Sequence, residues 1–144
     1  MVTGRQNTLN DFGLLLLRLG VGITFIIIGS PKLAGGPEEW EVVGSHAAYL
    51  GITSWPMFWG FFISIAEFFG GFLLILGLFF KPAAAVLLIT SIVTVASSIG
   101  QSAEFVYTAN AIAVGFVFLS MLFIGAGKHS LDRNIWKRRR RRLL

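Results

Sequence analysis

Two ionisable side chains of opposite sign, Arg18 and Glu67, lie inside long apolar stretches of the chain. A charge at membrane depth is costly, rarely faces lipid and commonly marks a functional or strongly structural site. At ~1.5 Å per residue, Arg18 lies roughly 9 Å from the start of its stretch and Glu67 roughly 15 Å from the start of the next. Across a hydrocarbon core about 30 Å thick, antiparallel stretches would place the two charges within about 6 Å in height. We therefore expect an Arg18–Glu67 pair, direct or through water, unless Arg18 snorkels to the headgroups.

A polar stripe in the third apolar stretch accompanies these charges. Its members recur at spacings of three and four residues, which places them on one face of a helix: Thr90, Thr94, Ser97 and Gln101. Taken singly, such hydroxyls more often satisfy backbone or join helices in lipid than bind a ligand. Together with Arg18 and Glu67, however, they indicate a polar cavity. Thr94 is then a candidate binding residue, and Lys32 a candidate at the cavity mouth.

Four apolar stretches must position these side chains: residues 12–30, 57–80, 82–99 and 105–124. Each has about the length that a helix needs to cross a bilayer. Their apolar runs are continuous rather than alternating, which favours helices over barrel strands. The sequence therefore predicts an all-α, four-helix membrane bundle over residues 1–133, followed by a basic tail at 134–144. Because Arg18 interrupts the first stretch and no small-x-small site follows, we do not expect a cleaved signal peptide.

Charge asymmetry predicts the orientation of this bundle. Four spans place both termini on one side, and basic residues favour the cytoplasmic side. Arg5, Lys81 and the basic tail lie on one side, whereas Glu38, Glu39, Glu41 and Glu104 lie on the other. Both termini are thus predicted to be cytoplasmic.

The connections differ greatly in length. Lys81 and Pro82 mark a tight turn between the second and third spans. The first connection is long and opens at Pro31 with a breaker-rich run. A short helix within residues 38–50 would lie over the outer mouth or in the interface, and an interfacial anchor is favoured over a lid.

The composition limits the cofactors and partners to be expected. The chain has no cysteine, which excludes disulfides and thiolate-bound clusters within it. His46 and His129 fall outside the spans on opposite sides, so no haem held by two histidines is expected, and no metal-binding motif is found. The run from Lys137 to Arg142 follows a membrane span, which is typical of binding to anionic lipids rather than nucleic acid.

Three groups of residues resemble the DoxX family of membrane proteins. They are Arg18-Leu19-Gly20 with Gly29-Ser30-Pro31-Lys32-Leu33, then Ala66-Glu67-x-x-Gly70-Gly71, and finally Gly125-x-Gly127-x-His129-Ser130-Leu131-Asp132-Arg133. The resemblance implies a four-helix protein of the bacterial inner membrane. The family name derives from a quinone-reducing, thiosulfate-oxidising complex, and other members occur with diverse redox or stress partners. Arg18, Lys32, Glu67, Ser130 and Asp132 are the positions carried over.

Three functions are compatible with these features. A quinone-interacting subunit of an oxidoreductase would use Arg18 to polarise a carbonyl and Glu67 to relay a proton, with electrons from a partner. A non-catalytic assembly or chaperone partner would use the charge pair only to fix helix register. A small-solute or lipid transporter with four spans would need a homo-oligomer. A ligand beside Glu67 would favour the first function, and a dry, closed ion pair the second.

Overall fold

The computed structural model describes residues 2–127 and 130–131, with side chains from residue 10 onward. The described chain is helical: α1 (Val2–Ala34), α2 (Gly36–Ser45), the short 3-10 helix η1 (His46–Leu50), α3 (Pro56–Leu76), α4 (Phe80–Gly100) and α5 (Phe105–Ile124). Four segments are long and apolar enough to cross a membrane: Asn10–Ala34 of α1 and the whole of α3, α4 and α5. The predicted all-α bundle of four membrane-length helices is confirmed.

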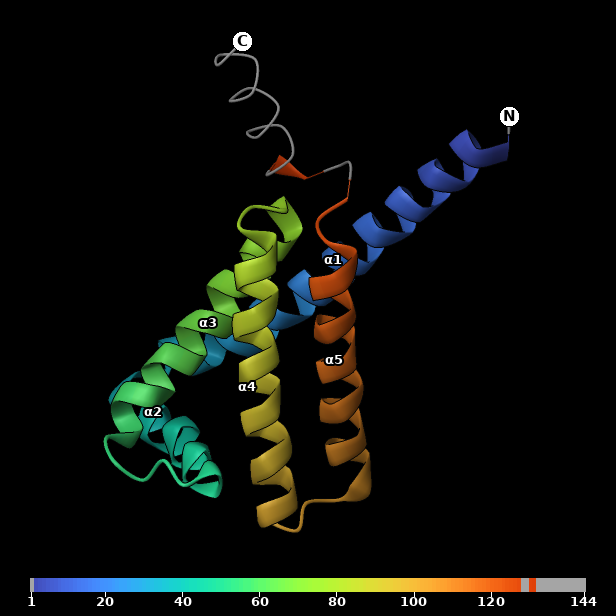
Figure 1. Cartoon of the computed structure of the whole chain (residues 1–144). Coiled ribbons are helices and arrows are strands. Elements are labelled where there is room, and N and C mark those ends of the chain that lie inside the picture. The colour runs from blue at the N-terminus through green and yellow to red at the C-terminus, as the bar shows by residue number, and fades with distance from the viewer. Residues whose placement is uncertain (1, 128–129, 132–144) are drawn as a thin grey trace.

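The four long helices form two antiparallel pairs, α1 with α3 and α4 with α5 (Figure 1). Helices α2 and η1 and the α4–α5 connection lie at one end of the bundle, which we call the α2 end. The tight α3–α4 turn lies at the opposite end. It is formed by residues 77–79 rather than by Lys81 and Pro82 as predicted, and these two residues belong to the first turn of α4. Helices α1 and α3 approach closely where Gly22 faces Gly71, because a Cβ on Gly22 would lie only 2.7 Å from the Gly71 carbonyl oxygen. This contact fixes the register of α1 against α3.

The apolar core lies toward the opposite end. Its buried members come from all four long helices: Phe25, Leu74, Phe80, Ala83, Ala84, Leu87, Phe118 and Met121. Phe25 of α1 and Phe118 of α5 meet edge to face, with ring centroids 5.0 Å apart. The buried residues of α5 are Phe118 and Met121, and both lie in its C-terminal half. The C-terminal half of α5 therefore packs into the core.

Helix α1 continues through Pro31, so the predicted start of a loop at this residue is wrong. Proline removes one backbone donor from the last turns of the helix. The Ser30 hydroxyl donates instead to the Ile27 carbonyl at 3.2 Å, which satisfies the acceptor that Pro31 leaves. The helix ends only at Ala34, before Gly36 at φ 76°. As a result, Lys32 is held on the last turn of α1.

The short helix expected within residues 38–50 is confirmed as α2 followed by η1. It packs on the bundle rather than lying apart from it, because Val43, Gly44 and Ala47 are buried. Gly44 and Gly60 allow α2 and α3 to cross with their backbones in contact: a Cβ on either would collide with a carbonyl of the other helix. The Tyr49 ring of η1 lies directly over Gly100 at the end of α4. These contacts cover the α2 end above α3 and α4.

Candidate functional site: an ion pair in the wall of a cavity

A salt bridge joins α1 to α3 near the α2 end. The Lys32 Nζ donates to Glu67 Oε2 at 2.7 Å. The Glu67 side chain is only 4% exposed, whereas that of Lys32 is 28% exposed. Glu67 is thus a buried carboxylate whose counter-ion reaches it from the last turn of α1. Two residues that the sequence singled out are brought together here.

The predicted Arg18–Glu67 pair is wrong. With Gly22 opposite Gly71, Arg18 lies level with the residues around Ile75, about 12 Å along α3 from Glu67 at ~1.5 Å per residue. The estimate of the two heights failed because it measured the depth of each residue from the start of its own apolar stretch. The actual register depends on how α1 packs against α3, and α1 extends beyond its apolar stretch at both ends.

Arg18 instead binds backbone carbonyls at the opposite end. It is 1% exposed; its Nε donates to Leu74 O at 2.9 Å, Nη2 to Ile75 O at 3.0 Å and Nη1 to Ala126 O at 2.8 Å. Its guanidinium also lies 5.5 Å from the centre of the Phe80 ring. The last turn of a helix presents carbonyls with partial negative charge, which a cation stabilises. Arg18 therefore connects α1, the end of α3 and the segment after α5.

The ending motif contributes to this Arg18 cluster. Ser130 is 2% exposed, its hydroxyl donates to Gly127 O at 3.0 Å, and its Cβ lies close to Gly77 in the α3–α4 turn. Asp132, His129 and the basic run from Lys137 to Arg142 lie outside the described residues. The roles expected for them remain predictions.

A cavity of about 310 Å³ lies between α1, α3, α4 and α5, with the ion pair in its wall. Its polar lining comes from all four helices: Thr24, Lys32, Glu67, Thr90, Ser91, Thr94, Tyr107 and Asn110. The remaining lining is Phe25, Ile28, Ala111 and Val114. Small-molecule sites commonly have volumes of about 300–1,000 Å³ and combine apolar walls with a few polar groups. Lys32, Glu67 and Thr94 thus share one cavity, while Arg18 is not part of its lining.

The hydroxyls of the cavity are bonded to their own helices. Thr90 donates to Leu87 O at 2.9 Å, Thr94 to Thr90 O at 3.0 Å and Thr24 to Gly20 O at 2.9 Å. A hydroxyl that has donated its hydrogen keeps lone pairs that accept a bond. These side chains can therefore accept from a ligand, and the Lys32 ammonium can donate to one.

The stripe predicted on the third span divides between two environments. Thr90 and Thr94 line the cavity, whereas Ser97 is buried and donates to Thr94 O at 3.0 Å. Sequence reasoning missed Thr24 and Tyr107. Tyr107 lies three residues before Asn110, and this spacing places both on one face of α5. That spacing was the available signal.

His46 of η1 is a titratable group at the α2 end. Burial and the positive charge of Lys32 lower the pKa of His46 below its ordinary value of 6.5, while Glu39 and Glu67 raise it by less. The imidazole is therefore neutral at neutral pH.

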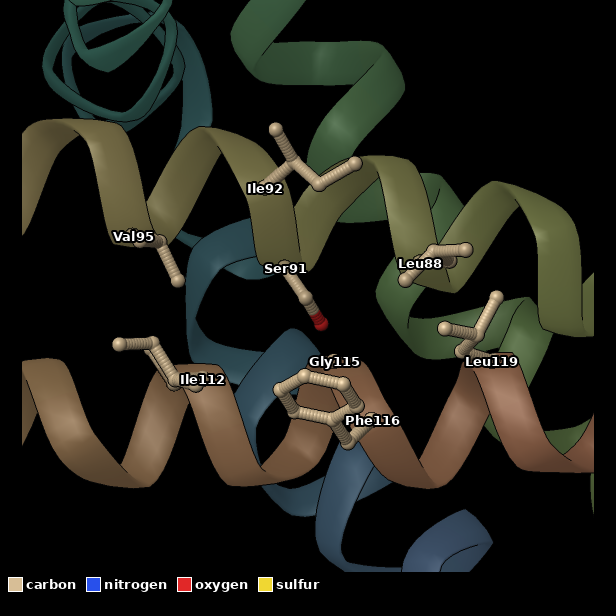
Figure 2. Close-up of a pocket in the computed structure, with 9 residues that line it drawn as sticks. Leu88, Ser91, Ile92, Val95, Ile112, Gly115, Phe116 and Leu119 are labelled. Carbon is tan, nitrogen blue, oxygen red and sulfur yellow. The ribbon is translucent and has the colours of Figure 1, made fainter.

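An apolar crevice runs along the other side of α5, between α4 and α5 (Figure 2). Its volume is about 230 Å³. Figure 2 shows the Ser91 hydroxyl pointing into the gap between the two helices, with Phe116 and Leu119 facing it from α5. Ser91 and Ala111 line both this crevice and the polar cavity. The α4–α5 crevice and the cavity are therefore adjacent.

The sequence has no cysteine, and the described residues contain no group of three side chains that would hold a metal ion. The groups that remain for chemistry are the ion pair and the hydroxyls, amide and phenol around it. They can hold a polar headgroup and move protons.

Comparison with known proteins agrees with the arrangement of these motifs. Neither curated proteins nor solved structures gave a match to the chain. The family model named DoxX, however, matches residues 13–99. This region contains Arg18, Lys32, Glu67 and Thr94, and it extends from the middle of α1 nearly to the end of α4. Because the match covers more than half of the chain, this four-helix membrane protein belongs to the DoxX family.

Proposed function

We propose that this protein is a quinone-binding membrane subunit of an oxidoreductase system. The observation that carries the proposal is the Lys32–Glu67 pair in the wall of a cavity large enough for a ring-sized headgroup. A pair that served only to fix helix register would be closed on all sides by packed side chains. Here it borders about 310 Å³ of space lined by further polar groups.

The residues of the cavity suit the two ends of such a headgroup. The Lys32 ammonium would donate a charge-assisted hydrogen bond to a carbonyl oxygen, and Glu67 would keep that ammonium in place. Thr90 and Thr94 would accept hydrogen bonds from the hydroxyls of the reduced form. A bound quinone would supply the redox chemistry, by taking up two electrons and two protons.

Protons and electrons would reach the site from different sources. Glu67 is the cavity's carboxylate and would hold or pass on a proton at its Oε atoms. Electrons would come from a protein partner that holds a redox centre. Arg18 has no headgroup contact in this proposal, since it stabilises the opposite end. The bacterial inner membrane is the proposed location, and the basic tail from Lys137 to Arg142 would bind its anionic lipids.

Quinone binding in nanodiscs tests the proposal. Lys32→Gln should weaken binding about tenfold or more, because a hydrogen bond to a charged group contributes roughly 1.5–3 kcal/mol. Glu67→Gln should weaken binding less but abolish turnover in the presence of the electron-donating partner. Lys81→Gln and Glu104→Gln, outside the cavity, are the matched controls.

Two results would contradict the proposal. One is a wild-type protein that binds no quinone, which would favour the assembly-partner function instead. The other is unchanged quinone binding by a folded Lys32→Gln variant.

A further inference from the structure

We infer that the cavity is entered sideways from the membrane, between α1 and α5, and that its ligand is a quinone whose long hydrocarbon tail leaves through this opening. The inference rests on the proposed function. It adds the class of quinone, the route by which the quinone enters the cavity and the orientation of the bound quinone. It is carried by a groove of about 390 Å³ on the lipid-facing surface between the two helices. We call this the α1–α5 groove.

The α1–α5 groove borders the polar cavity directly. Thr24, Phe25 and Val114 line both of them. From this shared boundary the groove runs along α1 past Gly20 to Leu16, toward the opposite end of the bundle. Apart from Thr24, its side chains are apolar, which suits a hydrocarbon chain and not a second polar group.

Two other approaches to the cavity lie at the α2 end and between α4 and α5. At the α2 end, α2 and η1 are packed on α3 and on the end of α4, with Tyr49 over Gly100. The α4–α5 crevice has a smaller volume, about 230 Å³ against about 390 Å³, and lies between two helices that contact each other. Between α1 and α5, by contrast, the Phe25 and Phe118 rings contact each other. The α1–α5 groove lies beside this contact, since Phe25 also lines the groove.

The position of the ion pair sets the orientation of the ligand. Lys32 and Glu67 lie near the α2 end, so a headgroup bound to them directs its tail along α1 toward Leu16. Surrounding lipid is as apolar as the groove, so the tail gains little free energy by leaving lipid. The groove matters because a headgroup that carries a tail cannot be seated unless the tail has an exit.

The test blocks this exit and compares two quinones with the same headgroup, one with a decyl tail and one with a methyl group in its place. Gly20→Phe places a ring in the groove, and a Cβ at Gly20 would meet no atom within 4 Å. Gly13→Phe is the matched control, because Gly13 is also exposed on α1 with open space around it but does not line the groove. Affinities are measured in nanodiscs, with ligand expressed as a fraction of lipid.

Wild type and Gly13→Phe should bind both quinones with similar affinity. Gly20→Phe should bind the decyl quinone about tenfold more weakly, because its ring occupies the space that the tail needs, and should bind the methyl quinone as before. Leu17→Trp, which also fills the groove, should give the same selective loss if Gly20→Phe folds poorly.

Three outcomes would overturn the inference. Equal loss of both quinones in the Gly20→Phe and Leu17→Trp variants would mean that the substitutions act on the headgroup site. Full retention of the decyl quinone in both variants, with its loss in Gly115→Phe, would place the exit in the α4–α5 crevice. Binding of the methyl quinone but not the decyl quinone by wild type would leave the proposed function intact and exclude the lateral route, whereas binding of neither would overturn the proposed function itself.

Discussion

Arg18 and Glu67 are both charged and both buried among apolar helices, yet their charges are compensated in different ways. Arg18 spreads its charge over three backbone carbonyls, whereas Glu67 is neutralised by one ammonium group. The first arrangement fixes the guanidinium by three hydrogen bonds, and Arg18 is only 1% exposed. The second leaves one side of the pair open to a cavity. At the scale of residues, this contrast separates a structural charge from a candidate functional one.

Arg18→Lys should lower the free energy of unfolding by about 3 kcal/mol or more. A single ammonium cannot reach Leu74, Ile75 and Ala126 together, and each lost bond to a charged group contributes roughly 1.5–3 kcal/mol. Denaturant unfolding in mild detergent measures the loss. Quinone binding by the folded fraction should persist; if stability were unchanged and binding lost, Arg18 would be a headgroup ligand after all.

The two partners of the ion pair should respond unequally to neutralisation. Lys32→Met leaves a carboxylate that is 4% exposed without a counter-ion, with an expected cost on the order of 3–5 kcal/mol. Glu67→Gln leaves a lysine whose side chain is 28% exposed and can turn toward water or headgroups, so the cost should be smaller. The double variant K32M/E67Q should be more stable than Lys32→Met alone. Strictly additive changes in the free energy of unfolding would contradict this coupling.

Glycine contacts set the positions of whole helices. Gly22 against Gly71 fixes α1 on α3, and Gly44 against Gly60 fixes α2 on α3. Since helices in lipid gain no hydrophobic free energy from each other, close backbone packing is a main source of their association. The elements that bear Lys32 and Glu67 are thus held by residues that have no side chains of their own.

Gly44→Ala should loosen α2 from the bundle. Its Cβ would collide with the Pro56 carbonyl, which belongs to backbone and cannot move aside as a side chain would. The expected cost is at least about 1–3 kcal/mol. Hydrogen exchange should show faster exchange in α2 and η1, while Gly13→Ala, with open space around its Cβ, should leave exchange unchanged. Unaltered exchange in Gly44→Ala would mean that the α2–α3 contact is not tight in the membrane.

The whole molecule is packed unevenly from one end to the other. Phe25, Leu74, Phe80 and Phe118 form a tight core toward the opposite end, and the Arg18 cluster closes it. Toward the α2 end, the polar cavity lies between the four long helices. The molecule therefore combines a closely packed half with a half that contains the polar cavity.

The orientation of the molecule in its membrane is open to a direct test. We expect the N-terminus and the C-terminus on the cytoplasmic side and α2 on the other side, because the order of the four spans in the sequence assigns Arg5, Lys81 and the basic tail to the same side. Reporter fusions at the C-terminus and in the connection between η1 and α3 would report these locations. A cytoplasmic signal from the reporter between η1 and α3 would contradict this topology.

The amino-acid sequence by itself determined the all-α class, the number of membrane-length helices and the short connection after α3. Each follows from continuous apolar runs and from local breakers, which act within one helix. The sequence also pointed to Lys32, Glu67 and Thr94, since polar groups are costly at membrane depth.

Only the tertiary structure decided which charge meets which. The register of α1 against α3 depends on the Gly22–Gly71 approach and on the continuation of α1 through Pro31. It placed Lys32 on Glu67, moved Arg18 to carbonyls near Ala126, and added Thr24 and Tyr107 to the cavity. Contacts between helices depend on residues far apart in the chain. The periodicity of residues within one helix therefore does not determine the axial register of that helix against its neighbour.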